Sequence, residues 1–187
     1  MPYFFVRVNG DTAHNDPSEP KCYVKGEPPH FPATYFNYYQ YCLDNNIVRI
    51  GWPDVGDIIA GNKTKALKNC YDMNNIPTHI KDYLSSFSKI PLKSNILMPN
   101  KDHPGELYLG EVIKTYLYYH NVPQHPYECS HRVGVKWDHD INGNPIIYRA
   151  SQLGINIIGG WWRRAFYEIR DITLMSNIDN ARRSNGF

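Results

Sequence analysis

Residues 106–119 read ELYLGEVIKTYLYY, a stretch in which branched aliphatic and aromatic side chains are typical of β-structure. The stretch is longer than an ordinary strand, so it predicts either one long, bent strand or a pair of strands. Gly110 is a natural position for a β-bulge, since glycine accepts the backbone conformation that a bulge requires. This stretch therefore indicates that strands form much of the fold.

Further short strands are expected on both sides of this stretch. Each is a run of β-forming residues that ends at a turn-forming residue such as Gly, Pro or Asn. In residues 132–137 polar and apolar side chains alternate, as in a half-buried strand. The other strands are expected at residues 3–8, 47–52, 94–98 and 145–148, with extended segments at 155–158 and 161–168.

Helices are expected where apolar residues recur at helical spacing. Residues 35–42 place three tyrosines and Cys42 on one face, and the paired asparagines at 45 and 46 end this helix. A second helix is expected at residues 77–88, with a proline in its first turn, and a third beyond Ile169. No repeat or linker divides the chain, so residues 1–187 are expected to form a single α+β domain, a small barrel with two or three flanking helices.

The composition excludes several classes of protein. The chain has 187 residues, of which 42% are hydrophobic and 20% are charged, so it can bury a core and is not disordered as a whole. Its net charge of +2 is too small for a histone-like or polybasic membrane-surface protein, although it allows a local basic face. No apolar run approaches the ~18 residues of a membrane span. The first residues, MPYFFVRVNGD, read as a strand and not as a signal peptide.

Cysteine and tyrosine usage give two further indications. The four cysteines lie far apart and form no CxxC pair, so neither a disulfide framework nor a zinc site is expected. Reduced thiols are typical of a cytoplasmic protein, which is the expected location. The 15 tyrosines suit either a half-exposed binding surface or an aromatic core, and both interpretations stay open.

Three fragments occur in an order that resembles a known superfamily. They are RIGWPDVGD at residues 49–57, LYLGEV at 107–112 with an aromatic run at 116–119, and HRVGVKW at 131–137. Together they resemble the PUA-like superfamily, and within it the EVE and YTH readers of modified bases. More specifically, the chain resembles the N-terminal DNA-recognition domains of modification-dependent restriction systems of the McrBC type. The resemblance covers residues 47–137.

This resemblance implies a curved β-barrel with a pocket that takes a flipped nucleobase between aromatic side chains. Trp52 matches the family's tryptophan after glycine and is the first candidate for a wall of that cage, with a core position as the alternative. Trp137 matches a structural tryptophan at the end of its strand. Further candidates for the base pocket are suggested by their chemistry and not by the motif: Tyr118, Trp161 and Trp162.

Basic side chains near these aromatics are candidates for phosphate contacts. Residues 159–164 read GGWWRR, where tryptophans beside arginines suit a binder of unstacked bases. The alternative for this segment is a strand edge protected by charge. We expect several basic side chains to line one face near the mouth of the pocket, with the backbone contacts made by Arg132, Lys136, Arg163 and Arg164 and further cations at Arg182 and Arg183.

Catalytic, cofactor and metal sites are not expected. Glu111 and Lys114 resemble the acid–lysine pair of restriction nucleases, but an extra residue between them should place them on opposite faces of a strand. The chain contains neither a GxSxG motif nor a phosphate-binding loop of Walker type. The histidines do not have metal-ligand spacing and are not expected to form a site: His120, His125, His131 and His139.

The leading hypothesis is a non-enzymatic module that reads a modified base of DNA, methylated in the simplest case, by flipping it into an aromatic pocket. Such a module would be the specificity part of a restriction or defence system, with an effector nuclease or motor domain elsewhere and no membrane partner. The alternative is an RNA-binding domain of the YTH or PUA kind that takes the base from a single strand. A third hypothesis, a small metal-dependent nuclease, requires carboxylates around one pocket.

Overall fold

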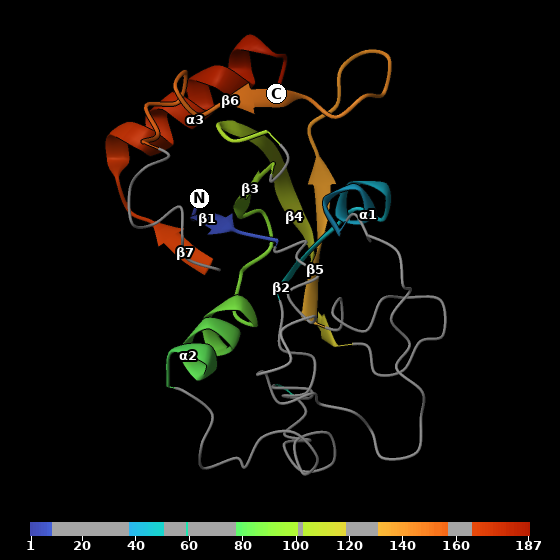
Figure 1. The fold of residues 1–187 in the computed structure, drawn as a ribbon, viewed down its shortest axis with the longest axis vertical. Coiled ribbons are helices and arrows are strands. Elements are labelled where there is room, and N and C mark those ends of the chain that lie inside the picture. The colour runs from blue at the N-terminus through green and yellow to red at the C-terminus, as the bar shows by residue number, and fades with distance from the viewer. Residues whose placement is uncertain (9–37, 51–58, 60–77, 101–102, 119–130, 157–165) are drawn as a thin grey trace.

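The computed structural model describes residues 1–8, 38–50, 59, 78–100, 103–118, 131–156 and 166–187. These residues form an α+β fold, in which seven strands make one mixed sheet and three helices surround it (Figure 1). The strands are β1 (Tyr3–Val6), β2 (Ile47–Ile50), β3 (Asn95–Pro99), β4 (Glu106–Tyr118), β5 (His131–Trp137), β6 (Ile147–Arg149) and β7 (Phe166–Ile169). The helices are α1 (Tyr38–Asp44), α2 (Thr78–Phe87) and α3 (Ile172–Ser184).

The strands of the sheet follow the order β2-β5-β4-β3-β1-β7, and β6 pairs with β4 outside this path. β1 and β3 are parallel, whereas the other pairs are antiparallel. Within the described residues β2 and β7 end this order, so the sheet is not closed into a barrel. The expected α+β class with flanking helices is confirmed, but the expected closed barrel is wrong. The parallel pairing of β1 with β3 puts β7 at the far edge of the sheet, away from β2.

Each face of the sheet buries its own hydrophobic cluster. On one face, Val133 belongs to a cluster with Leu43 of α1 and Phe87 of α2. On the other face, Leu97 belongs to a cluster with Ile178 of α3. The sheet is therefore the middle layer, with α1 and α2 on one side and α3 on the other. Side chains that alternate along a strand enter different layers.

Trp137 joins β5 to α1. Its side chain is 1% exposed, and its Nε1–H donates to the carbonyl oxygen of Cys42 at 3.1 Å. The prediction that this tryptophan is structural is confirmed. Asn46 follows α1 with a φ of 52°, the left-handed conformation that ends many helices, which confirms that the paired asparagines stop this helix.

The long strand β4 is continuous but irregular. Its pairing with β5 shifts between Val112 and Lys114 and again between Lys114 and Leu117, whereas Gly110 lies in regular register. The prediction of a bulge at Gly110 is therefore wrong. A Cβ atom at Gly110 would lie 2.6 Å from Cγ1 of Val135 and 2.9 Å from Cε3 of Trp137, so this glycine allows β5 to approach closely.

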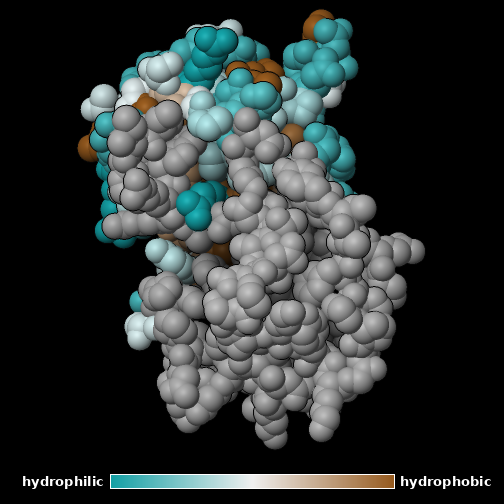
Figure 2. Space-filling model, in the orientation of Figure 1, coloured by the Kyte–Doolittle hydropathy of each residue, from teal (hydrophilic) through white to brown (hydrophobic). Residues whose placement is uncertain are grey.

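The described surface is mostly hydrophilic in the view of Figure 2, with hydrophobic residues in separate places. Scattered exposed hydrophobic residues of this kind are normal for a folded domain. Among the helices that the structure describes, none has both the length and the apolar character needed to cross a bilayer.

Candidate functional site

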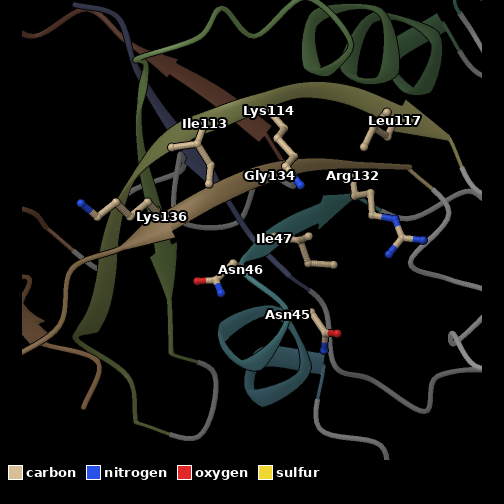
Figure 3. Close-up of a pocket in the computed structure, with 9 residues that line it drawn as sticks. All are labelled: Asn45, Asn46, Ile47, Ile113, Lys114, Leu117, Arg132, Gly134 and Lys136. Atoms are coloured by element: carbon tan, nitrogen blue, oxygen red, sulfur yellow. The ribbon is translucent and has the colours of Figure 1, made fainter. Parts of the chain in front are cut away.

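A hollow of about 560 Å³ lies where β2, β5 and the second half of β4 run side by side (Figure 3). The turn between α1 and β2 forms its lower rim in this view. Three of its residues come from β5, three from β4, and three from this turn and the start of β2. They are Asn45, Asn46, Ile47, Ile113, Lys114, Leu117, Arg132, Gly134 and Lys136.

The hollow opens on the α3 side of the sheet. Along β5, Val133 and Val135 enter the cluster that α1 and α2 cover. Arg132 and Lys136 alternate with them and therefore point to the opposite face, where they line the hollow. The β5 residues of the site thus occupy positions that do not face the larger core.

The register shifts of β4 determine which side chains reach this face. Glu111 lies opposite Lys136 and Lys114 lies opposite Gly134, two positions apart on β5. Because positions two apart share a face, Glu111 and Lys114 also share one. The expectation that these two residues lie on opposite faces is wrong, because the bulge at Ile113 absorbs the extra residue.

Gly134 allows Lys114 to lie across β5. A Cβ atom at position 134 would come within 2.7 Å of the Cβ of Lys114 and within 3.3 Å of its Cδ. The aliphatic part of Lys114 therefore lies against the bare backbone of Gly134. A larger residue at position 134 would displace this lysine from the hollow.

Among the nine lining residues that the structure describes, three are cations and none is an acid. Arg132 is 5% exposed, and its backbone is paired across the two strands with that of Arg49, which is 2% exposed. Lys114 and Lys136 are exposed, and neither forms an ion pair in the part of the chain that the structure describes. A hollow that is lined by these cations attracts anions.

The remaining lining residues are apolar or carry amides. Ile113 is 46% exposed and Leu117 is 40% exposed, although both are large hydrophobic residues. Asn45 and Asn46 are also exposed and can donate or accept hydrogen bonds. The hollow therefore offers cations, apolar surface and amides to one ligand, a combination suited to an anion with an organic part.

The comparison with family descriptions matches residues 34–152, more than half of the chain, to the Domain of unknown function (DUF8426). The chain belongs to this family. A comparison with curated proteins finds no match. All nine residues that line the hollow lie inside the DUF8426 segment, whereas β1, β7 and α3 lie outside it.

The structure brings two of the predicted backbone-contact residues together. Arg132 and Lys136 line the hollow of the DUF8426 segment from the same strand face. Tyr118 does not line the hollow. It is paired with His131 on the other face of the sheet, and the two ring centroids lie 5.1 Å apart. The other predicted site residues lie outside the described residues: Trp52, Trp161, Trp162, Arg163 and Arg164.

Two of the four histidines occupy structural positions. His131 is buried, and its Nδ1 lies 2.8 Å from the hydroxyl of Tyr116. His139 Nδ1 lies 2.8 Å from the carbonyl oxygen of Trp137. His120 and His125 lie outside the described residues. Within the described ranges no three His, Cys, Asp or Glu residues gather in a way that could hold a metal ion.

Arg182, which we expected at the pocket mouth, has a structural partner instead. Its Nη2 and Nε donate to the two carboxylate oxygens of Asp138 at 2.6 and 2.8 Å. Asp138 is 2% exposed, so this bidentate ion pair fixes α3 to the end of β5. Arg183 lies on the exposed side of α3 and donates to Asn180 at 2.6 Å.

Three residues of the hollow were not among the predicted site residues: Lys114, Ile113 and Leu117. Strict alternation along β4 would separate Ile113 from Lys114, and a bulge between valine and lysine leaves no clear mark in the sequence. The only available signal was Gly134 inside an otherwise β-forming strand, since such a glycine often marks a close approach.

Proposed function

We propose that this chain is a nucleic-acid-binding module that recognises a modified base of DNA, methylated in the simplest case, as the specificity part of a restriction or defence system. The observation that carries the proposal is the cationic hollow, in which Arg132 and Lys136 of the HRVGVKW fragment meet Lys114. Arginine and lysine on one face are typical of phosphate contacts.

The proposal includes a relationship to the PUA-like superfamily and its EVE and YTH branches. It is supported by the order of the three sequence fragments and by the pairing of the long, bulged strand β4, which carries the second fragment, with β5, which carries the third. A bulged strand bends and twists its sheet, which suits the curved surface of such readers. The proposal does not require closure of the sheet.

In the proposed mechanism one base leaves the duplex and stacks in an aromatic cage that includes Trp52. Extrusion of the base costs a few kcal/mol. Stacking on aromatic side chains offsets this cost, because it stabilises the bound base by about 1–3 kcal/mol. Phosphate contacts at the hollow hold the strand without reading its sequence. A methyl group adds only about 0.8 kcal/mol when buried, so the preference for the modified base is expected to be moderate.

The test compares matched oligonucleotides that differ in a single methyl group. Binding is measured by fluorescence anisotropy with methylated and unmethylated DNA duplexes and with methylated RNA. Trp52→Ala should weaken binding of the modified duplex by about 5- to 150-fold, the equivalent of one lost stack, and should reduce the preference for the modified base. Salt-dependent binding of any duplex should persist in this variant.

Two results would change the proposal. Tighter binding of methylated single-stranded RNA would favour the RNA-reading alternative. If Trp52→Ala greatly lowers the melting temperature and leaves the base preference unchanged, Trp52 is a core residue and the cage assignment is wrong. Lys89→Ala is the matched control, because Lys89 is an exposed cation that follows α2 and does not line the hollow.

A further inference from the structure

We propose that the hollow binds one nucleotide unit, a phosphate together with its sugar and base, and that Lys114 is a phosphate ligand held in place by Gly134. This inference rests on the proposed function for the class of ligand. It goes further in assigning a second binding site, separate from the aromatic cage, and a residue that the family resemblance does not include.

The size and the lining of the hollow favour a nucleotide over a bare phosphate. A volume of about 560 Å³ is far larger than a single phosphate group needs and lies within the range of about 300–1,000 Å³ of organic-ligand sites. Ile113 and Leu117 provide apolar surface beside the cations, as a sugar or a base face requires. Asn45 and Asn46 provide amides, which pair with the polar edges of bases.

The cations differ in rigidity in a way that suits a phosphate. Arg132 is 5% exposed, so surrounding atoms fix its planar guanidinium, whose geometry matches two phosphate oxygens. Lys114 and Lys136 are exposed; Lys114 extends from β4 toward Gly134, and Lys136 extends from β5 at the end of the hollow opposite Arg132 (Figure 3). Lys114 lies opposite Gly134, between Arg132 and Lys136, where it can contact a phosphate that enters from solvent.

The position of Lys114 follows from the backbone. The register shift between Val112 and Lys114 places this lysine opposite Gly134, on the face of Arg132. The missing side chain at Gly134 leaves the space in which the stem of Lys114 lies, since an added Cβ would be 2.7 Å from the Cβ of Lys114. Gly134 is therefore a positioning residue, and it acts through Lys114.

The experiment measures three probes against the full chain by isothermal titration calorimetry: inorganic phosphate, adenosine 5′-monophosphate and a short DNA oligonucleotide. The variants are Lys114→Ala, Lys114→Arg, Gly134→Ala and the control Lys89→Ala. Lys114→Ala should weaken the nucleotide and the oligonucleotide by roughly 10- to 150-fold, as the loss of a hydrogen bond to a charged group does. Lys114→Arg should restore part of the affinity, and Lys89→Ala should have no effect.

Gly134→Ala should weaken binding although Lys114 is still present. In the double variant Gly134→Ala/Lys114→Ala, the alanine at 134 should add little to the loss, because two residues that act through one contact are not additive. Thermal unfolding of each variant, followed by circular dichroism, separates this effect from misfolding. Additive losses in the double variant would overturn the positioning role of Gly134.

The outcomes distinguish this inference from the proposed function. If the oligonucleotide binds the wild-type chain but Lys114→Ala changes nothing, the inference is overturned and the proposed function stands. If the mononucleotide binds through Lys114 and the oligonucleotide does not bind, the site takes free nucleotides and the proposed function fails. Inorganic phosphate that binds as tightly as the mononucleotide overturns the assignment of a nucleotide unit.

Discussion

Tyr3 and Tyr148 are buried tyrosines whose hydroxyl groups donate to carboxylates. Tyr3 donates to Asp179 of α3, and Tyr148 donates to Asp138 at 2.9 Å. Burial, followed by the hydrogen bond and the charge of Asp179, raises the pKa of Tyr3 to about 12. Burial and the charge of Asp138 also raise the pKa of Tyr148. The folded protein therefore favours the protonated form of both hydroxyl groups.

The stability of the protein should fall in alkaline solution. An unfolded tyrosine loses its proton near pH 10, whereas Tyr3 in the folded state keeps it up to a pH of about 12. The unfolded state therefore binds fewer protons in this range, and the free energy of unfolding decreases as the pH rises from about 10 to about 12. Below pH ~10 the full contribution is present.

Urea unfolding of wild-type protein and of Tyr3→Phe across this range checks the prediction. The variant should lose stability less steeply with pH, because it has no hydroxyl proton to release at position 3. Equal slopes in the two proteins would show that Tyr3 does not contribute to the alkaline loss.

At the level of elements, α3 is fixed at both ends. Asp171 caps its first turn, since a carboxylate oxygen accepts from the backbone N–H of Leu174 at 3.0 Å. Near its last turn, Arg182 binds Asp138 through two hydrogen bonds. The buried Ile178 between these points packs in the cluster on this face of the sheet. In the part of the chain that the structure describes, this ion pair links the end of the helix to the residue that follows β5.

Removal of the Arg182 side chain should lower the free energy of unfolding. Arg182→Met leaves the carboxylate of Asp138 buried without its counter-charge, and breaking such a pair costs about 3–5 kcal/mol. A loss at the lower end of this range is expected, because Tyr148 still donates a hydrogen bond to Asp138. Urea unfolding measures the loss, and Arg183→Met on the exposed side of the same helix is the control, with an expected change within about 0.5 kcal/mol.

The double variant Arg182→Met/Asp138→Asn tests the physical reason. Removing the second charge should recover part of the lost stability, because the penalty comes from an uncompensated buried carboxylate. A double variant that is less stable than Arg182→Met would contradict this explanation.

Local patterns predicted most elements but not how they combine. The strands at β1, β2, β3 and β5, the helices and the turn at Asn46 follow from alternation, helical spacing and turn-forming residues. The parallel pairing of β1 with β3 joins residues about ninety positions apart, and the ion pair of Asp138 with Arg182 spans 44. Such long-range contacts leave no periodic signal in one sequence.

The candidate site could be predicted only in part for the same reason. Arg132 and Lys136 came from a sequence fragment with regular alternation, and they lie together as strand geometry requires. Lys114 depends on a bulge whose position is set by pairing with β5, and Tyr118 was assigned by its chemistry without knowledge of its face. A one-residue shift along a strand moves a side chain to the other side of the sheet.

For the molecule as a whole, charge placement matters more than net charge. The chain carries only +2 overall, but three cations line one hollow, and its described lining residues include no acid. A ligand with several phosphates should therefore bind locally and in a salt-dependent manner. Nucleic acid is the ligand with several phosphates that we propose for this protein.

The most direct test is the salt dependence of binding to a fluorescent DNA duplex, with and without one methylated base. The account predicts binding that weakens linearly on a logarithmic salt scale, with tighter binding of the methylated duplex at every salt concentration. Lys136→Ala should reduce the slope by about 0.9, the value of one lost phosphate contact on duplex DNA, and should leave the methyl preference intact. A flat salt response, or the same slope in Lys136→Ala and wild-type protein, would contradict a phosphate-binding role for the hollow.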